Sequence, residues 1–265
     1  MRVKNIVVKI CRPFLFYILC LGFIAILSRL SFAEQKGADP RYIFYKGNSL
    51  YEEAKYDEAI TQYRRLLDEG FESGNLYYNL GNCYFKKGGL GKAILNYERA
   101  RRFIPRDKDL KSNYEYVKSL VKNNVPEVKR KLLIRLVVNF FDRLTIGEIA
   151  ALLSIIYVLV ILIIIATIYL KISKRYSVTA VSILIISFVL SFASLKGKIA
   201  HLNKEAIIIK ESVDAKFEPL ESGTVHYTLY EGMKVYLLLS EDGWYKVRRS
   251  DGKIGWIEKS ALEIM

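Results

Sequence analysis

Two long apolar runs dominate the second half of the chain. Ile149 to Leu170 is 22 residues long without a charged side chain, and Ser177 to Leu195 is 19 residues long. A helix needs about 20 apolar residues to cross a hydrocarbon core about 30 Å thick. Only the basic stretch from Lys171 to Tyr176 separates the two runs. The pattern therefore predicts a transmembrane hairpin of two helices, which we assign to residues 148–196.

A shorter apolar run lies near the N-terminus. It extends from Pro13 to Leu27, follows four basic residues and precedes Ser31-Phe32-Ala33. A basic start, an apolar centre and a small-x-small site are typical of a secretory signal peptide, which we assign to residues 1–33. An uncleaved membrane anchor is the alternative.

The signal peptide and the hairpin together predict the topology. Export carries the chain from Glu34 onward across the membrane, and two later spans return it to the same side. Lys171, Lys174 and Arg175 in the turn favour a cytoplasmic position for that turn. We therefore expect a bacterial inner-membrane protein with two spans after signal cleavage and both soluble domains in the periplasm.

Between these segments, the chain repeats itself after 34 residues. The matching pairs are Gly47 and Gly81, Asn48 and Asn82, Ala59 and Ala93, Ile60 and Ile94, and Tyr63 and Tyr97. This period resembles the tetratricopeptide repeat, in which small residues let paired helices approach and aromatic residues fill the space between them. Helical spacing from Leu110 to Val121 predicts a closing helix. Residues 38–123 are thus expected to be an α-helical repeat domain of a kind that binds partners.

In tetratricopeptide domains, the first helix of each repeat lines a concave face. The resulting candidate peptide-binding residues are Asn48, Asn79, Asn82, Lys86 and Asn113. A side-chain amide carries a donor and an acceptor, which suits an extended peptide backbone. Phe44 stands where carboxylate-binding repeats have lysine, so an internal peptide segment is favoured over a terminal carboxylate. The alternative is that the asparagines bond only to neighbouring helices.

The hydrophobic pattern changes to short strands in residues 204–265. The β-prone runs are 207–209, 225–229, 234–239, 244–248 and 254–258, and turn signals such as Asp242-Gly243 and Asp251-Gly252 separate them. From Glu231 onward the segment resembles bacterial SH3-like domains, which bind cell-wall peptides or other proteins. A small all-β SH3-like barrel is therefore expected. Trp244 and Trp256 are candidate surface residues, although aromatics in so small a barrel also serve as core.

Residues 124–147 are expected to form an amphipathic juxtamembrane segment. Its apolar residues at helical spacing are Leu133, Leu136, Val137, Phe140, Phe141 and Leu144, and Lys129, Arg130, Lys131 and Arg135 supply positive charge. The segment fits a helix lying in the membrane interface or one docked on the repeat domain. Thr145 and Glu148 match a capping box and predict where the first span begins.

The net charge of +14 falls to +9 without the five positive charges of residues 1–33. Six of the remaining nine flank the hairpin, which indicates contact with anionic membrane lipid and argues against nucleic-acid binding. His201 and His226 are isolated, and Cys83 is the single cysteine after signal cleavage, expected in the core. We expect no catalytic residues, metal ligands or cofactor, and therefore no enzyme.

The order of the parts resembles the BatE family of aerotolerance-operon membrane proteins over nearly the whole chain. The resemblance implies a non-enzymatic envelope scaffold that acts with von Willebrand A-type membrane proteins and a MoxR-type ATPase. The alternative function is an envelope anchor or sensor that binds cell-wall peptide through the SH3-like domain.

Overall fold

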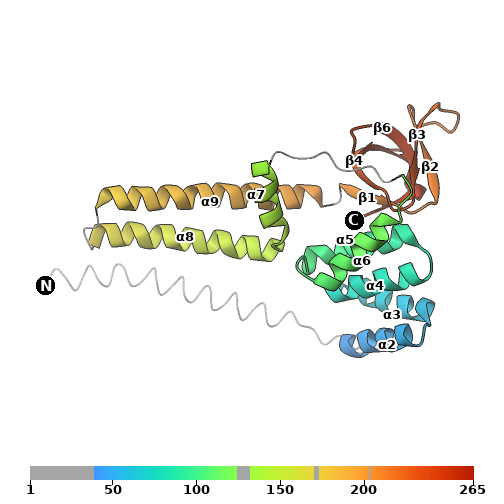
Figure 1. Ribbon diagram of the computed structural model, residues 1–265, viewed down its shortest axis with the longest axis horizontal. Coiled ribbons are helices and arrows are strands. Elements are labelled where there is room, and N and C mark those ends of the chain that lie inside the picture. Colours follow the sequence, from blue (N-terminus) through green and yellow to red (C-terminus); the bar gives the residue numbers. More distant parts are fainter. Residues whose placement is uncertain (1–38, 124–131, 170–172, 203) are drawn as a thin grey trace. The chain divides into compact units, whose positions relative to one another are not determined.

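The computed structural model describes residues 39–123, 132–169, 173–202 and 204–265 (Figure 1). The predicted signal peptide, Lys129 to Lys131, Leu170 at the end of the first apolar run, and residues 171 and 172 of the basic turn lie outside the described residues.

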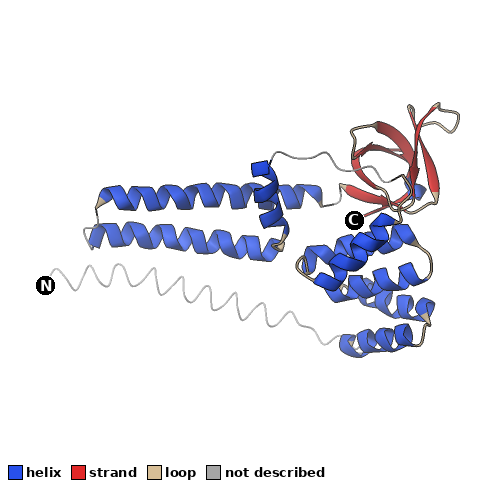
Figure 2. Ribbon diagram, in the orientation of Figure 1, coloured by secondary structure: helices blue, strands red, loops and turns tan. Residues whose placement is uncertain are grey.

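Residues 39–123 form a helical repeat-like region (Figure 2). Its helices are α2 (Pro40–Glu52), α3 (Tyr56–Asp68), α4 (Gly74–Lys86), α5 (Leu90–Phe103) and α6 (Lys108–Ser119). Ser73 caps α4 by accepting a hydrogen bond from the Leu76 N–H at 3.2 Å, and Asp107 caps α6 through the Leu110 N–H at 2.8 Å. The helical repeats expected from the 34-residue period are confirmed.

Glycine and tyrosine pair within each repeat because the helices approach closely. A Cβ atom on Gly47 would lie 2.5 Å from the Tyr63 ring, and one on Gly81 would lie 2.5 Å from the Tyr97 ring. Both rings are fully buried. Any side chain larger than hydrogen would therefore push the paired helices apart.

Residues 204–265 form an antiparallel sheet. Its strands are β1 (Glu205–Ile208), β2 (Ser212–Lys216), β3 (Val225–Tyr230), β4 (Lys234–Glu241), β5 (Trp244–Arg249), β6 (Ile254–Glu258) and β7 (Leu262–Ile264). Their order is β3-β2-β6-β5-β4-β1-β7, so the described sheet is open, with β3 and β7 at its edges. The predicted five-stranded closed barrel is not confirmed. The strand prediction omitted β2 and β7. Strand β2 alternates polar and apolar residues but contains few with high strand propensity, and β7 has only 3 residues and is positioned by pairing with β1 at the other end of the domain.

The sheet packs against the second repeat. β1 contacts α5, and apolar residues of the helices and the sheet share one core. Gly232 allows this packing, because a Cβ atom there would lie 2.7 Å from Ile94 and 2.8 Å from Val121. Its φ of +82° also favours glycine. Arg99 adds a hydrogen bond of 2.6 Å from Nη2 to the Ile264 carbonyl.

Two helices, α8 (Ile146–Tyr169) and α9 (Lys174–His201), are long and apolar enough to cross a membrane. They pack side by side (Figure 1). Most of their large apolar side chains are exposed, which distinguishes them from the core helices of a water-soluble domain. The capping box is confirmed: Thr145 Oγ1 accepts from the Glu148 N–H at 3.1 Å, and Glu148 Oε2 accepts from the Thr145 N–H at 2.8 Å. Helix α7 (Leu132–Asp142) precedes this cap, and a short 3-10 helix, η1 (Lys259–Ala261), lies between β6 and β7.

Candidate functional site

The asparagines predicted from the repeat pattern link the first helices of the stack. Asn79 on α4 donates from Nδ2 to Oδ1 of Asn48 on α2 at 2.9 Å. Asn113 on α6 donates from Nδ2 to Oδ1 of Asn82 on α4 at 3.3 Å, and to the hydroxyl of Tyr78 at 2.8 Å. We call the surface that carries Asn48, Asn79, Asn82 and Asn113 the asparagine face. All four side chains are partly exposed, so this face is open to a ligand.

Two buried tyrosines hold the asparagine face from below. The Tyr63 hydroxyl donates to Asn48 Oδ1 at 2.7 Å, and the Tyr97 hydroxyl donates to Asn82 Oδ1 at 2.7 Å. Burial raises the pKa of both phenols, so they remain protonated donors at neutral pH. Each central amide is thereby fixed in orientation by a hydrogen bond from its own repeat.

The Asn48 side chain retains hydrogen-bonding capacity toward a ligand. Its Oδ1 atom accepts from both Tyr63 and Asn79. Its Nδ2 group donates no hydrogen bond within the part of the chain that the structure describes. An extended peptide offers carbonyl oxygens that such a donor can reach. Lys86 lies exposed one turn beyond Asn82 on α4 and adds a positive charge beside the face.

Aromatic side chains flank the amides, and the sequence analysis did not single them out. Tyr45 lies three residues before Asn48 and is 68% exposed, while Tyr116 lies three residues after Asn113 and is 59% exposed. A spacing of three residues places each ring on the same side of its helix as the asparagine. That spacing was readable from the sequence. Exposed rings beside fixed amides provide apolar contact area for a bound peptide.

The two candidate tryptophans of the sheet differ in how deeply they are buried. Trp244 begins β5, is half-buried and lies opposite Glu258, with the Lys216 ammonium 5.5 Å from its ring centroid. Trp256 on β6 is only 6% exposed and lies opposite Lys246. Of the two rings, Trp244 presents the larger surface to a ligand.

Metal and thiol chemistry have no assembled site in the described residues. No group of three or more His, Cys, Asp or Glu side chains there is arranged to hold a metal ion. Cys83 is fully buried in the core of the first repeats. Burial raises the pKa of its thiol to about 12, which keeps the sulfur protonated and unreactive.

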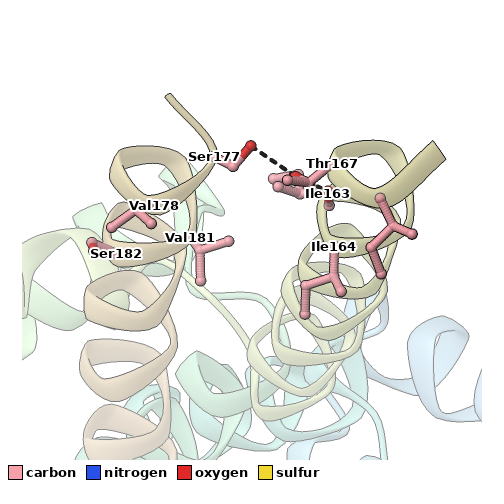
Figure 3. Close-up of a pocket in the computed structure, with 8 residues that line it drawn as sticks. Ile163, Ile164, Thr167, Ser177, Val178, Val181 and Ser182 are labelled. Carbon is pink, nitrogen blue, oxygen red and sulfur yellow. Dashed lines mark hydrogen bonds between the residues drawn. The ribbon is translucent and has the colours of Figure 1, made fainter. Parts of the chain in front are cut away.

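A cavity of about 290 Å³ lies between α8 and α9, lined mainly by isoleucine and valine. Figure 3 shows Thr167 and Ser177 pointing toward one another across it, with a hydrogen bond of 2.7 Å between their hydroxyl groups. Such hydroxyl pairs join helices in an apolar environment. The cavity thus belongs to the packing of the hairpin.

No known family profile matches the chain. Over 100 residues the chain is 33% identical to the human Protein O-mannosyl-transferase TMTC1, and the match covers 36% of this chain and 11% of that protein. One solved structure, NlpC2 from Trichomonas vaginalis, is 25% identical over 23% of this chain and 25% of its own length. Its TM-score of 0.21 is too low to establish a shared fold.

The similarity to the human protein requires one correction to the predictions made from the sequence. The prediction that the chain is not an enzyme is contradicted, because this relative is named as a transferase. The chain spans only 11% of the relative's length, so the name transferase describes the activity of the human protein alone.

Proposed function

We propose that this protein is a membrane-anchored scaffold whose asparagine face binds an extended internal segment of a partner protein. The observation that carries the proposal is the fixed amide of Asn48. Its Oδ1 atom accepts hydrogen bonds from Tyr63 and Asn79, whereas its Nδ2 group donates none within the described residues. A donor already held in place loses little conformational freedom on binding, which favours affinity.

The packing of the sheet on α5 supports a position on the same side of the membrane for both soluble parts. Two segments that share one core must lie on the same side of a membrane, and two intervening spans meet that condition. With the signal peptide expected for residues 1–33, that side is the periplasm. The resemblance to the BatE family suggests von Willebrand A-type proteins and a MoxR-type ATPase complex as the surroundings of the scaffold.

Peptide binding can be tested on the full chain in nanodiscs with peptides selected from a random phage-displayed library. Asn48→Asp keeps the acceptor for Tyr63 and Asn79 but removes the free amide donor. We expect about fivefold weaker binding, since one peptide hydrogen bond contributes about 1 kcal/mol. Asn123→Asp makes the same chemical change at an exposed site outside the asparagine face and serves as the control. Equal affinity of both variants and the wild-type protein contradicts the proposal.

The topology has its own test. Single cysteines at Glu72, Asp251 and Lys174 are introduced after the native cysteines are replaced by alanine. A membrane-impermeant maleimide added to intact cells is expected to label the first two positions and spare the third. Labelling of position 174 alone would reverse the proposed orientation.

A second candidate function is binding of cell-wall peptide by an SH3-like C-terminal domain. The half-buried Trp244 with Lys216 above its ring favours it, because an aromatic surface beside a cation suits a peptide that carries carboxylates. Sedimentation with isolated cell wall separates the two candidates. Loss of co-sedimentation in Trp244→Ala, with the Asn48→Asp variant unaffected, would assign wall binding to the sheet.

A further inference from the structure

Helix α7 divides into three sectors around its axis. Leu132, Leu136 and Phe140 follow one another at intervals of four residues and form an apolar stripe. The second sector is polar and consists of Arg135, Asn139 and Asp142. The third contains Phe141, which is buried. Phe141 therefore marks a side of helix α7 that packs against protein.

The apolar stripe has no cover in the described residues. Leu132, Leu136 and Phe140 are 57 to 60% exposed. Large exposed apolar surfaces on an 11-residue helix are unfavourable in water. The known contact of α7 is with α9, on the side of Phe141, which leaves the stripe facing outward.

The connection to α8 fixes the level of α7 along the hairpin. Helix α7 ends at Asp142 and α8 begins at Ile146 after the capped turn at Thr145. The Lys198 ammonium near the end of α9 donates a hydrogen bond to the Leu144 carbonyl within this turn. The end of α7 is thus tied to the adjacent ends of both candidate spans, where a membrane-spanning hairpin leaves the hydrocarbon core.

We propose that α7 lies in the membrane interface, with Leu132, Leu136 and Phe140 inserted among the lipid acyl chains. Helix α8 follows α7 after a short turn and exposes large apolar side chains of its own, which argues for lipid as the occupant. The exposed Arg135 and Arg143 lie near the lipid headgroups, where positive charge is favoured next to anionic lipid. This proposal does not depend on peptide binding by the asparagine face.

Spin labelling of the full chain in phosphatidylethanolamine and phosphatidylglycerol vesicles tests the proposal. The native cysteines are replaced by alanine, and single labels are attached at Leu136, Phe140 or the exposed Asp142. Oxygen partitions into lipid and a nickel chelate stays in water. We expect the labels at 136 and 140 to collide several-fold more with oxygen than with the chelate, and the control label at 142, on the polar sector of α7, to show the reverse preference.

A label at Val158, exposed in the middle of α8, provides the reference for a side chain in lipid. High chelate accessibility at 136 and 140, alongside a lipid signal at 158, would show that α7 lies in water and overturn the proposal. Protection of 136 and 140 from both reagents would overturn it in favour of docking on protein. A water-exposed label at 158 would contradict the membrane hairpin itself.

Discussion

The hydroxyl group of Tyr63 and the side-chain carbonyl of Asn48 are 2.7 Å apart and join the two helices of the first repeat. Tyr63 is fully buried, so its hydroxyl depends on Asn48 for a hydrogen-bond partner. Asn48→Ala should therefore lower the free energy of unfolding by about 1–3 kcal/mol, the cost of leaving a buried polar group unsatisfied.

Thermal denaturation of Asn48→Ala and of the double variant with Tyr63→Phe measures this contribution. The double variant should recover part of the loss, because the orphaned hydroxyl is gone. Wild-type stability of Asn48→Ala would show that the hydroxyl finds another partner. Because Asn48→Ala also removes the hydrogen-bond acceptor of Tyr63, Asn48→Asp, which keeps that acceptor, is the better probe of peptide binding.

Gly91 determines how closely the sheet approaches α5. A Cβ atom at this position would lie 2.4 Å from the Ile208 carbonyl oxygen, and the Gly91 N–H donates to Glu231 Oε1 at 2.8 Å. Gly91→Ala should therefore separate the sheet from the repeats. We expect faster proteolytic cleavage before β1 at residues 202–204.

Gly89→Ala is the matched control, since a Cβ atom there makes an ordinary contact of 3.5 Å with the Tyr84 carbonyl. Resistance to proteolysis in both variants would indicate that the interface adjusts to an added methyl group.

Glu98 should make the stability of the repeat and sheet depend on pH. Burial alone raises the pKa of Glu98, but Lys234 and Arg101 and the hydrogen bond from the Tyr114 hydroxyl at 2.7 Å outweigh it and lower the pKa. A lowered pKa in the folded state stabilises the fold above the ordinary glutamate range. This contribution is lost as the pH falls through the folded pKa.

Denaturant unfolding at a series of pH values checks this effect. Glu98→Gln should remove the acid-dependent part of the curve, whereas Glu115→Gln on the exposed side of α6 should leave it in place. An unchanged curve in Glu98→Gln would assign the acid sensitivity to other carboxylates.

Cys83 should behave as a core residue. Its buried thiol, with a pKa of about 12, is expected to resist alkylation at neutral pH until the protein unfolds. Cys83→Ala should cost roughly 1 kcal/mol of stability through lost packing. Rapid modification of Cys83 in the folded protein would contradict both statements.

The sequence by itself determined those features in which residues close along the chain cooperate. Hydrophobic periodicity and local capping define the repeat helices, the two apolar helices and the start of α8 at Thr145, because a helix satisfies its backbone hydrogen bonds within one segment. The recurrence of Gly47 and Tyr63 as Gly81 and Tyr97 was readable from the sequence, whereas their close approach is seen only in the fold.

Tertiary structure alone decided the features that join distant segments. Strands β2 and β7 acquire their hydrogen bonds from partners far along the chain, and the contact of the sheet with α5 depends on shape at Gly91 and Gly232. The sequence suggested the asparagine face, but only the fold shows that Tyr63 and Asn79 occupy the Asn48 acceptor. The physical reason is that a hydrogen-bond partner is set by distance in space, which no local pattern encodes.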